Sequence, residues 1–126
     1  MTQSHKILVV DDEASIVELC QIILEDAGYQ VRGAISGSQA MELITEEMPD
    51  LVLLDVMMPG MTGIEVCRQI RARCENRQPA IVMYTADDRD ETRMHSLSAG
   101  ANDLITKRTP IFELPDKISP YLASNC

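Results

Sequence analysis

Apolar and polar residues along this chain form two alternating kinds of segment. Short apolar runs are typical of strands buried on both faces of a sheet, and apolar residues at helical spacing are typical of helices. The apolar runs, one of them weak, occupy residues 6–10, 29–34, 51–54, 80–84 and 103–106. Segments with helical spacing lie between them, at residues 13–27, 36–48, 64–74 and roughly 88–99. This alternation predicts an α/β fold with a doubly wound parallel sheet and right-handed crossovers.

Several residues mark the ends of the predicted helices. Gly28 and Gly100 are expected to stop the helices that precede them, and Ser36 is expected to cap the next helix. The helix that ends at Gly100 is mostly polar. We expect its two large apolar side chains, Met94 and Leu97, to face inward.

The C-terminal segment has a different pattern. Pro110, Pro115 and Pro120 recur every five residues, and proline inside a helix removes a hydrogen bond and clashes with the preceding turn. Pro115 fits the first turn of a helix. We therefore expect a short or irregular final helix.

Composition and charge narrow the class of protein. The 126 residues are enough for one domain, taken as residues 1–126, and with 45% hydrophobic but only 3% aromatic residues its core must be aliphatic and rich in Met. The net charge of −9 argues against direct nucleic-acid binding. Solubility and an acidic pocket that awaits a cation explain this charge equally well. We expect neither a signal peptide nor a membrane span, and hence a cytoplasmic protein.

The four cysteines do not suggest a metal site. Cys20, Cys67, Cys74 and Cys126 form no C-x-x-C pair, and the chain has only two histidines, so zinc is not expected. The first three fall on apolar helix faces, where reduced thiols serve as small core residues in the cytosol.

Polar side chains stand where four of the predicted strands end. Asp55 closes the run at 51–54, and Asp11 and Asp12 close the first run. Thr85 and Lys107 follow two later runs. Ligands of open parallel sheets bind beyond the carboxyl ends of the strands. These side chains therefore predict a cation site beside an anion site, the combination that phosphoryl chemistry needs.

Each of these groups has a role in such chemistry. Mg²⁺ prefers oxygen ligands, which Asp11, Asp12 and Asp55 supply. Asp55 can act as a nucleophile toward a phosphoryl group while a cation offsets the repulsion among the acids. Lys107 can bind the product phosphate as a mobile point charge, and Thr85 can donate its hydroxyl.

Ordinary structural roles compete with this interpretation. Asp12 could simply cap the helix that begins at residue 13. An isolated Asp, Thr or Lys at a strand end is more often solvated than functional. The joint occurrence at four strand tips favours the functional interpretation.

These residues carry a resemblance to a known family. The chain resembles the receiver domains of bacterial two-component response regulators, most strongly over residues 5–107. The shared motifs are Asp11-Asp12, the loop from Asp55 to Gly63, Thr85-Ala86, Gly100-Ala101 and Lys107.

The resemblance implies a flavodoxin-like sheet of five strands in the order 2-1-3-4-5. It also implies that Asp55 accepts a phosphoryl group from a phosphohistidine on a sensor histidine kinase or phosphotransfer domain. Thr85 and Lys107 would bind that group, and Thr85 would move toward it on activation.

The resemblance further implies a metal site and two positions that tune phosphoryl lifetime. Asp12, Asp55 and the backbone carbonyl of Met57 would hold Mg²⁺, and Asp11 would act through water. The Met57 and Asp87 side chains would border the path of the hydrolytic water.

Two positions depart from the family's pattern. Arg108 follows Lys107 where the family usually has a proline after a cis peptide bond, and the nearest proline is Pro110. The aromatic switch position of the family aligns with Leu104, which has neither a ring nor a hydroxyl. The usual coupling through that position is therefore expected to be weakened or replaced.

The sequence thus predicts a phosphoacceptor switch, a regulated binding module rather than a metabolic enzyme. Its expected partners are a sensor kinase and a downstream protein or effector domain, with a homodimer as a further option. One alternative is a receiver-like scaffold that takes no phosphate. Another is an aspartyl phosphatase, which would want a second acid where Met57 stands. A nucleotide- or flavin-binding domain is disfavoured, because Asp11-Asp12-Glu13 has the wrong charge for a phosphate loop.

Overall fold

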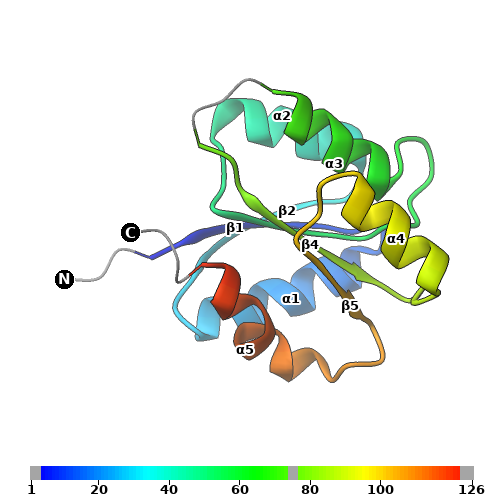
Figure 1. Ribbon diagram of the computed structural model, residues 1–126. Coiled ribbons are helices and arrows are strands. Elements are labelled where there is room, and N and C mark those ends of the chain that lie inside the picture. The colour runs from blue at the N-terminus through cyan, green and yellow to red at the C-terminus, as the bar shows by residue number, and fades with distance from the viewer. Residues whose placement is uncertain (1–3, 74–76, 123–126) are drawn as a thin grey trace.

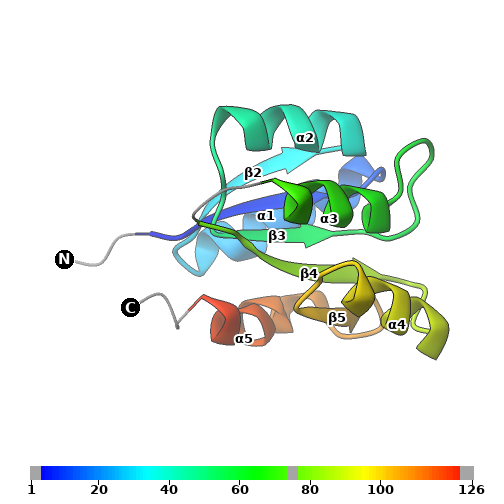
Figure 2. The ribbon, with the colours of Figure 1, turned by 45° about the horizontal axis from the view of Figure 1, so that its top comes forward.

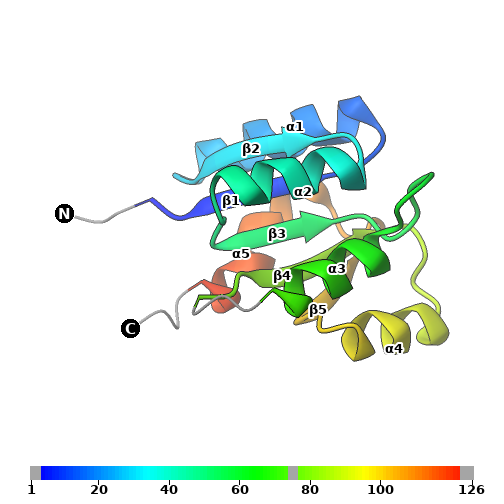
Figure 3. The same cartoon turned by 90° about the horizontal axis from the view of Figure 1, so that it is seen from above.

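A computed structural model describes residues 4–73 and 77–122 of the chain. Its centre is one parallel sheet in the order β2-β1-β3-β4-β5, which Figure 3 shows from above. The strands are β1 (Lys6–Val10), β2 (Gln30–Ala34), β3 (Leu51–Leu54), β4 (Ala80–Thr85) and β5 (Asp103–Thr106). The predicted α/β fold is confirmed, as is the strand order that the resemblance implied.

Helices cover both faces of the sheet (Figure 1). The helices are α1 (Ala14–Asp26), α2 (Gly37–Glu46), α3 (Gly63–Ala72), α4 (Asp90–Ser98) and α5 (Leu114–Ile118). The helices α2, α3 and α4 share one face, while α1 and α5 cover the other. The strand arrowheads in Figure 2 point toward the side where α3 and α4 begin.

Each face of the sheet has its own apolar core. Along β1, Leu8 and Val10 face α2 and α3, whereas Ile7 and Val9 face α1 and α5. Side chains of consecutive strand residues point to opposite faces. Because both faces are covered, the interior strands read as unbroken apolar runs, which explains why the sequence pattern identified them.

The predicted helix ends are largely confirmed. Gly28 and Gly100 have φ values of 101° and 109°, a region that favours glycine. The Ser36 hydroxyl accepts a hydrogen bond from the Gln39 N–H at 3.1 Å, which caps α2. The capping alternative for Asp12 is wrong, because α1 begins without a side-chain cap.

The expectation for α4 is wrong. Met94 and Leu97 are 66% and 46% exposed, whereas Thr92 and Ser96 are buried. The physical reason is a hydrogen bond at the start of the helix: the Thr92 hydroxyl donates at 2.7 Å to the carboxylate of Asp87, in the loop before α4, and this holds the Thr92 side of the helix inward. The helix contacts β5 and α3.

The C-terminal segment is irregular, as predicted. The five-residue α5 has Pro115 in its first turn and lies between two short 3₁₀ helices, Ile111–Glu113 and Ser119–Tyr121. It buries Leu114 and Ile118 against the sheet. The peptide between Lys107 and Arg108 is trans.

Two remaining expectations concern cysteines and membrane spans. Cys20 and Cys67 are buried free thiols, as expected, whereas Cys74 and Cys126 lie outside the described residues. Among the described residues, no helix has the length and apolar character needed to cross a membrane.

Candidate functional site

Three carboxylates meet at the carboxyl ends of two neighbouring strands. The register pairs Val10 of β1 with Leu54 of β3, so the acids that follow these strands lie side by side. One carboxylate oxygen from each of Asp11, Asp12 and Asp55 lies within 4.8 Å of the others. Asp11 and Asp55 are 2% and 5% exposed, and Asp12 is exposed to solvent. The predicted acidic cluster is confirmed as a spatial group.

Lys107 reaches this cluster from the loop after β5. Its Nζ lies 2.7 Å from Asp11 Oδ2 and 3.2 Å from Asp55 Oδ2. Burial lowers the pKa of Lys107, but the hydrogen bond to Asp11 and the charge of Asp55 outweigh burial and leave that pKa raised. Lys107 is therefore a permanent cation between two buried acids.

Asp55 is a buried carboxylate with mixed surroundings. Burial raises its pKa, the Lys107 charge opposes this, and the Asp11 charge adds to it, with a raised pKa as the net result. The Met57 N–H donates to Asp55 Oδ1 at 3.3 Å. The ionised form is thus less well solvated than in water, a property that suits a nucleophile.

Gly63 holds the Asp55 backbone in place. A Cβ at position 63 would overlap the Asp55 carbonyl oxygen and crowd the Val56 Cα. The Gly63 N–H also donates to the Val56 carbonyl at 3.0 Å. Because only glycine fits, α3 begins directly against the backbone of the acid. The loop motif contained Gly63, but nothing local in the sequence indicates the close approach.

Thr85 ends β4, which lies next to β3 in the sheet. It is fully buried, and its carbonyl accepts a hydrogen bond from the Lys107 N–H at 2.8 Å. Its hydroxyl accepts a hydrogen bond from the Asp87 N–H at 3.2 Å. Thr85 and Lys107 are thus joined through the backbone at the same sheet edge.

The donor set fits a hard divalent cation. Three carboxylates and one ammonium leave two negative charges uncompensated within a small volume. Oxygen ligands of this kind suit Mg²⁺. Asp11, Asp12 and Asp55 can therefore hold the cation. The role of the Met57 backbone carbonyl as a further ligand stays a prediction.

The other predicted residues have defined places. Leu104 is 3% exposed and packs in the core on the α3 side of the sheet. The Met57 side chain is 62% exposed at the rim of the site. The Asp87 carboxylate is bound by Arg89 and Thr92. The suggested roles of these residues in switching and phosphoryl lifetime stay predictions.

Sequence reasoning missed two contacts around Lys107. The Tyr84 ring centroid lies 5.8 Å from the Lys107 Nζ, a cation–π contact. Arg108, which replaces the family's proline, pairs with Asp88 in the loop after β4. The sequence pattern indicates Tyr84 only as part of an apolar strand, and no local pattern indicates the second contact.

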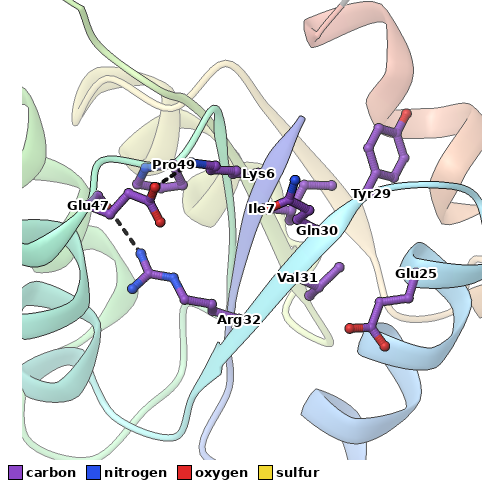
Figure 4. A pocket seen from close by; sticks show the side chains of 9 residues that line it. All are labelled: Lys6, Ile7, Glu25, Tyr29, Gln30, Val31, Arg32, Glu47 and Pro49. Atoms are coloured by element: carbon purple, nitrogen blue, oxygen red, sulfur yellow. Dashed lines mark hydrogen bonds and ion pairs between the residues drawn. The ribbon is translucent and has the colours of Figure 1, made fainter. Parts of the chain in front are cut away.

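A cavity of about 450 Å³ lies beside the edge strand β2, away from these residues (Figure 4). Lys6 and Arg32 line it, but both bind Glu47: Lys6 through the carboxylate and Arg32 through the backbone carbonyl at 2.9 Å. Three of its charged groups, Lys6, Arg32 and Glu47, thus satisfy one another. The strand tips are therefore the stronger candidate site.

Comparison with known proteins agrees with this geometry. The family model described as the response regulator receiver domain matches residues 7–119. Among solved structures, the BeF3-activated N-terminal receiver domain of RstA from Klebsiella pneumoniae is 37% identical, with a TM-score of 0.84 over 93% of this chain and 97% of that chain.

Two further structures are similar over nearly their whole length. The chemotaxis protein CheY4 of Vibrio cholerae is 29% identical, with a TM-score of 0.89 over 95% of this chain and 100% of that chain. A CheY-like response regulator receiver domain protein from Methanospirillum hungatei is 30% identical, with a TM-score of 0.87 over 96% and 95%.

Proposed function

This chain belongs to the response regulator receiver domain family, and from that premise we propose that it is a phosphoacceptor switch. In this proposal Asp55 accepts a phosphoryl group from the phosphohistidine of a sensor kinase or phosphotransfer domain. The observation that carries the proposal is the Lys107 ammonium between the buried carboxylates of Asp11 and Asp55. Such a site combines a nucleophile, an acidic cluster that can bind a cation, and a positive charge that can bind the product phosphoryl group.

The transfer is a simple displacement. A carboxylate oxygen of Asp55 forms a bond to phosphorus while the bond between phosphorus and the imidazole nitrogen breaks. The imidazole keeps the electron pair and then binds a proton from solvent. Mg²⁺, when bound by Asp11, Asp12 and Asp55, supplies neutralisation of charge on the transferring oxygens.

Two residues of the chain can bind the transferred phosphoryl group. Lys107 places its ammonium beside the Asp55 oxygen, where it can bind a phosphoryl oxygen. The Thr85 hydroxyl can donate to another phosphoryl oxygen while it still accepts from the Asp87 N–H. These contacts favour the phosphorylated state because they form only after transfer.

The protein is proposed to catalyse only its own phosphorylation and slow dephosphorylation. An aspartyl phosphatase would need a general acid close to the nucleophile, whereas the residue two positions beyond Asp55 is the apolar and exposed Met57. This argues for a regulated binding module whose output is a contact with a downstream protein.

Intact mass after incubation with acetyl phosphate tests the proposal. We expect the natural chain to gain one phosphate only when Mg²⁺ is present, and Asp55→Asn to gain none. Asp88→Asn, which changes an acid outside the cluster, serves as a matched control and should still gain phosphate. Absence of a gain in the natural chain, with acetyl phosphate and with a phosphorylated kinase alike, would support the scaffold alternative instead.

The stability of the protein in metal-free buffer provides an independent test of the proposal. Because the folded pKa of Asp55 is raised, its ionised form lowers stability at neutral pH, and that loss is recovered as the pH falls through the folded pKa. We expect Asp55→Asn to be more stable than the natural chain at pH 7, with the difference narrowing in acid. Mg²⁺ should stabilise the natural chain by about 2.7 kcal/mol at a hundredfold excess over Kd, and the variant less.

A further inference from the structure

The Lys107 ammonium has neighbours of two kinds. Two are carboxylates, since Nζ lies 2.7 Å from Asp11 Oδ2 and 3.2 Å from Asp55 Oδ2. Another is the ring of Tyr84, whose centroid lies 5.8 Å from Nζ. The Lys107 side chain is 17% exposed and Tyr84 is 5% exposed, so this cation and this ring meet largely out of water. Two anions and an uncharged ring thus surround the same ammonium.

Backbone pairing at the edge of the sheet brings the ring and the ammonium together. The strands β4 and β5 pair in a register that sets Tyr84 opposite Ile105, two residues before Lys107. The Lys107 N–H then donates to the carbonyl of Thr85 at 2.8 Å. The sheet therefore anchors both partners of the contact through their backbones.

Tyr84 is itself fixed in the core between the sheet and the helices α1 and α5. It belongs to the cluster of buried side chains that includes Cys20 of α1 and Leu114 of α5. Burial, together with the Cys20 thiol, raises the pKa of the Tyr84 hydroxyl, and the Lys107 charge opposes only part of this rise. The ring is therefore an uncharged phenol at physiological pH.

Phosphoryl transfer changes both carboxylate neighbours of Lys107 but leaves the ring unchanged. In the proposed function an Asp55 oxygen bonds to phosphorus, and Asp11 helps to hold the cation. Each carboxylate then shares its negative charge with another partner and attracts Lys107 less strongly. The Tyr84 ring takes part in neither bond, so its attraction for the ammonium persists through the reaction.

We propose that Tyr84 is a positioning residue whose ring holds the Lys107 ammonium beside Asp55 while the phosphoryl group is transferred. This inference rests on the proposed phosphoacceptor function. A cation above an aromatic face is attracted by the quadrupole of the ring, and the attraction is stronger when both are desolvated. Lysine has a flexible stem and a strongly hydrated ammonium, so without the ring Lys107 can turn to solvent once its carboxylates are occupied.

A ring suits this role better than a further acid. The carboxylates of the cluster already leave negative charge uncompensated beside one ammonium. Another carboxylate would add repulsion and would compete with the phosphoryl group for the ammonium. An aromatic face attracts the ammonium without a net charge and leaves its N–H donors available for phosphoryl oxygens.

The competing explanation is that Tyr84 merely fills the core. Core filling needs apolar volume but no ring, so Tyr84→Leu and Tyr84→Phe would then differ only in stability. Positioning needs the aromatic face, so Tyr84→Phe keeps it and Tyr84→Leu loses it. Val82→Ala is the matched control, because Val82 belongs to β4 and to the same buried cluster but offers no ring.

Proton NMR in metal-free buffer tests the contact without any phosphate. The current of an aromatic ring shifts the signals of protons above its face upfield. We expect the Lys107 side-chain signals to lie upfield of those of the exposed Lys117 in the natural chain, in Tyr84→Phe and in Val82→Ala. In Tyr84→Leu this difference should vanish. Unchanged Lys107 signals in Tyr84→Leu would show that the ring does not face the ammonium, and would overturn the proposal.

The rate of phosphate gain from limiting acetyl phosphate with Mg²⁺ tests the positioning itself. Tyr84→Leu should be slower than the natural chain by about fivefold, which corresponds to about 1 kcal/mol of cation–π attraction. Tyr84→Phe and Val82→Ala should remain close to the natural chain. In a Lys107→Met background no ammonium is left to position, so Tyr84→Leu should have no further effect there.

Folding and phosphorylation itself are separated from positioning by two controls. Urea unfolding checks that each variant is folded, and Tyr84→Met, whose flexible side chain fills irregular gaps, replaces Tyr84→Leu if that variant does not fold. Equal slowing by Tyr84→Leu with and without the Lys107 ammonium, or equal rates of Tyr84→Leu and Tyr84→Phe, overturns the positioning role and leaves the proposed function intact. Failure of the natural chain to gain phosphate overturns both.

Discussion

The helices α3 and α4 lie on the same face of the sheet, yet they are held there by different forces. Each begins shortly after a site residue, α3 after the loop that follows Asp55 and α4 after the loop that follows Thr85. The buried residues of α3 include Val66 and Ile70, whereas those of α4 are Thr92 and Ser96. The two helices thus present opposite kinds of side chain to the interior.

The difference separates a more firmly attached half of the site from a less firmly attached one. Burying a large apolar side chain contributes about 1.5–3 kcal/mol, and a typical net hydrogen bond contributes about 1 kcal/mol. The Asp55 side of the site is therefore backed by the stronger attachment. A switch needs a nucleophile that stays in place and a neighbouring element that moves at low cost, and elements that move come from the less stable parts of a fold.

The largest effect is expected in the body of α3. Ile70 is fully buried, so Ile70→Ala should lower the free energy of unfolding by about 2–5 kcal/mol through lost burial and a cavity. Urea unfolding measures this, with Gln69→Ala on the exposed face of the same helix as the control. A loss below that of an ordinary surface substitution would contradict the proposed contrast between the helices.

The next effect concerns the start of α3. Gly63→Ala should destabilise by about 1–3 kcal/mol through overpacking against the Asp55 backbone. It should also impair Mg²⁺-dependent phosphorylation, because the carbonyl of the acceptor residue must shift. Gly60→Ala, at a position with open space around the added atom, should strain the loop but keep phosphorylation. Equal phosphorylation in both variants would show that Gly63 does not position Asp55.

A smaller effect of opposite sign is expected in α4. Ser96→Ala removes a buried hydroxyl that has no hydrogen-bond partner within residues 4–73 and 77–122, and it adds a better helix former, so stability should rise by about 1 kcal/mol. Ser98→Ala, on the exposed side of the same helix, controls for helix propensity alone. If both variants change stability equally, the buried hydroxyl carries no penalty.

The smallest effect is expected on the outer face of α4. Replacing the exposed Met94 and Leu97 together by Gln should change stability by less than about 0.5 kcal/mol per site and leave phosphorylation of Asp55 unchanged. Denaturant unfolding and intact mass measure the two quantities. A large loss of stability would mean that these side chains pack inward after all.

Much of the fold could be predicted because its signals are local. The strands β1 and β3 are continuous apolar runs, and an acid follows each one directly. Gly28, Ser36 and Gly100 act within a few residues of their own helix ends, so their roles followed from their type. The acidic cluster was predictable for a related reason: parallel strands bring their carboxyl ends to one edge.

The rotation of α4 could not be predicted, because its sequence has little apolar periodicity. Met94 and Leu97 were the obvious inward candidates on apolarity alone. The bond from Thr92 to Asp87, in the loop before α4, and the bond from Arg71 of α3 to the Gly100 carbonyl decided otherwise, and the apolar pattern indicates neither contact.

The sequence by itself determined the order of the elements, the ends of most helices and the set of charged groups at the strand tips. These depend on side-chain type, on local spacing and on the geometry common to parallel sheets. Only the tertiary structure decided that Lys107 lies between Asp11 and Asp55, that Gly63 fits against the Asp55 carbonyl and that α4 turns its polar face inward. These three features depend on how helices and loops pack on the sheet, which side-chain type and local spacing do not fix: Lys107 comes from 96 residues beyond Asp11, and Gly63 and α4 pack against the loops that precede them.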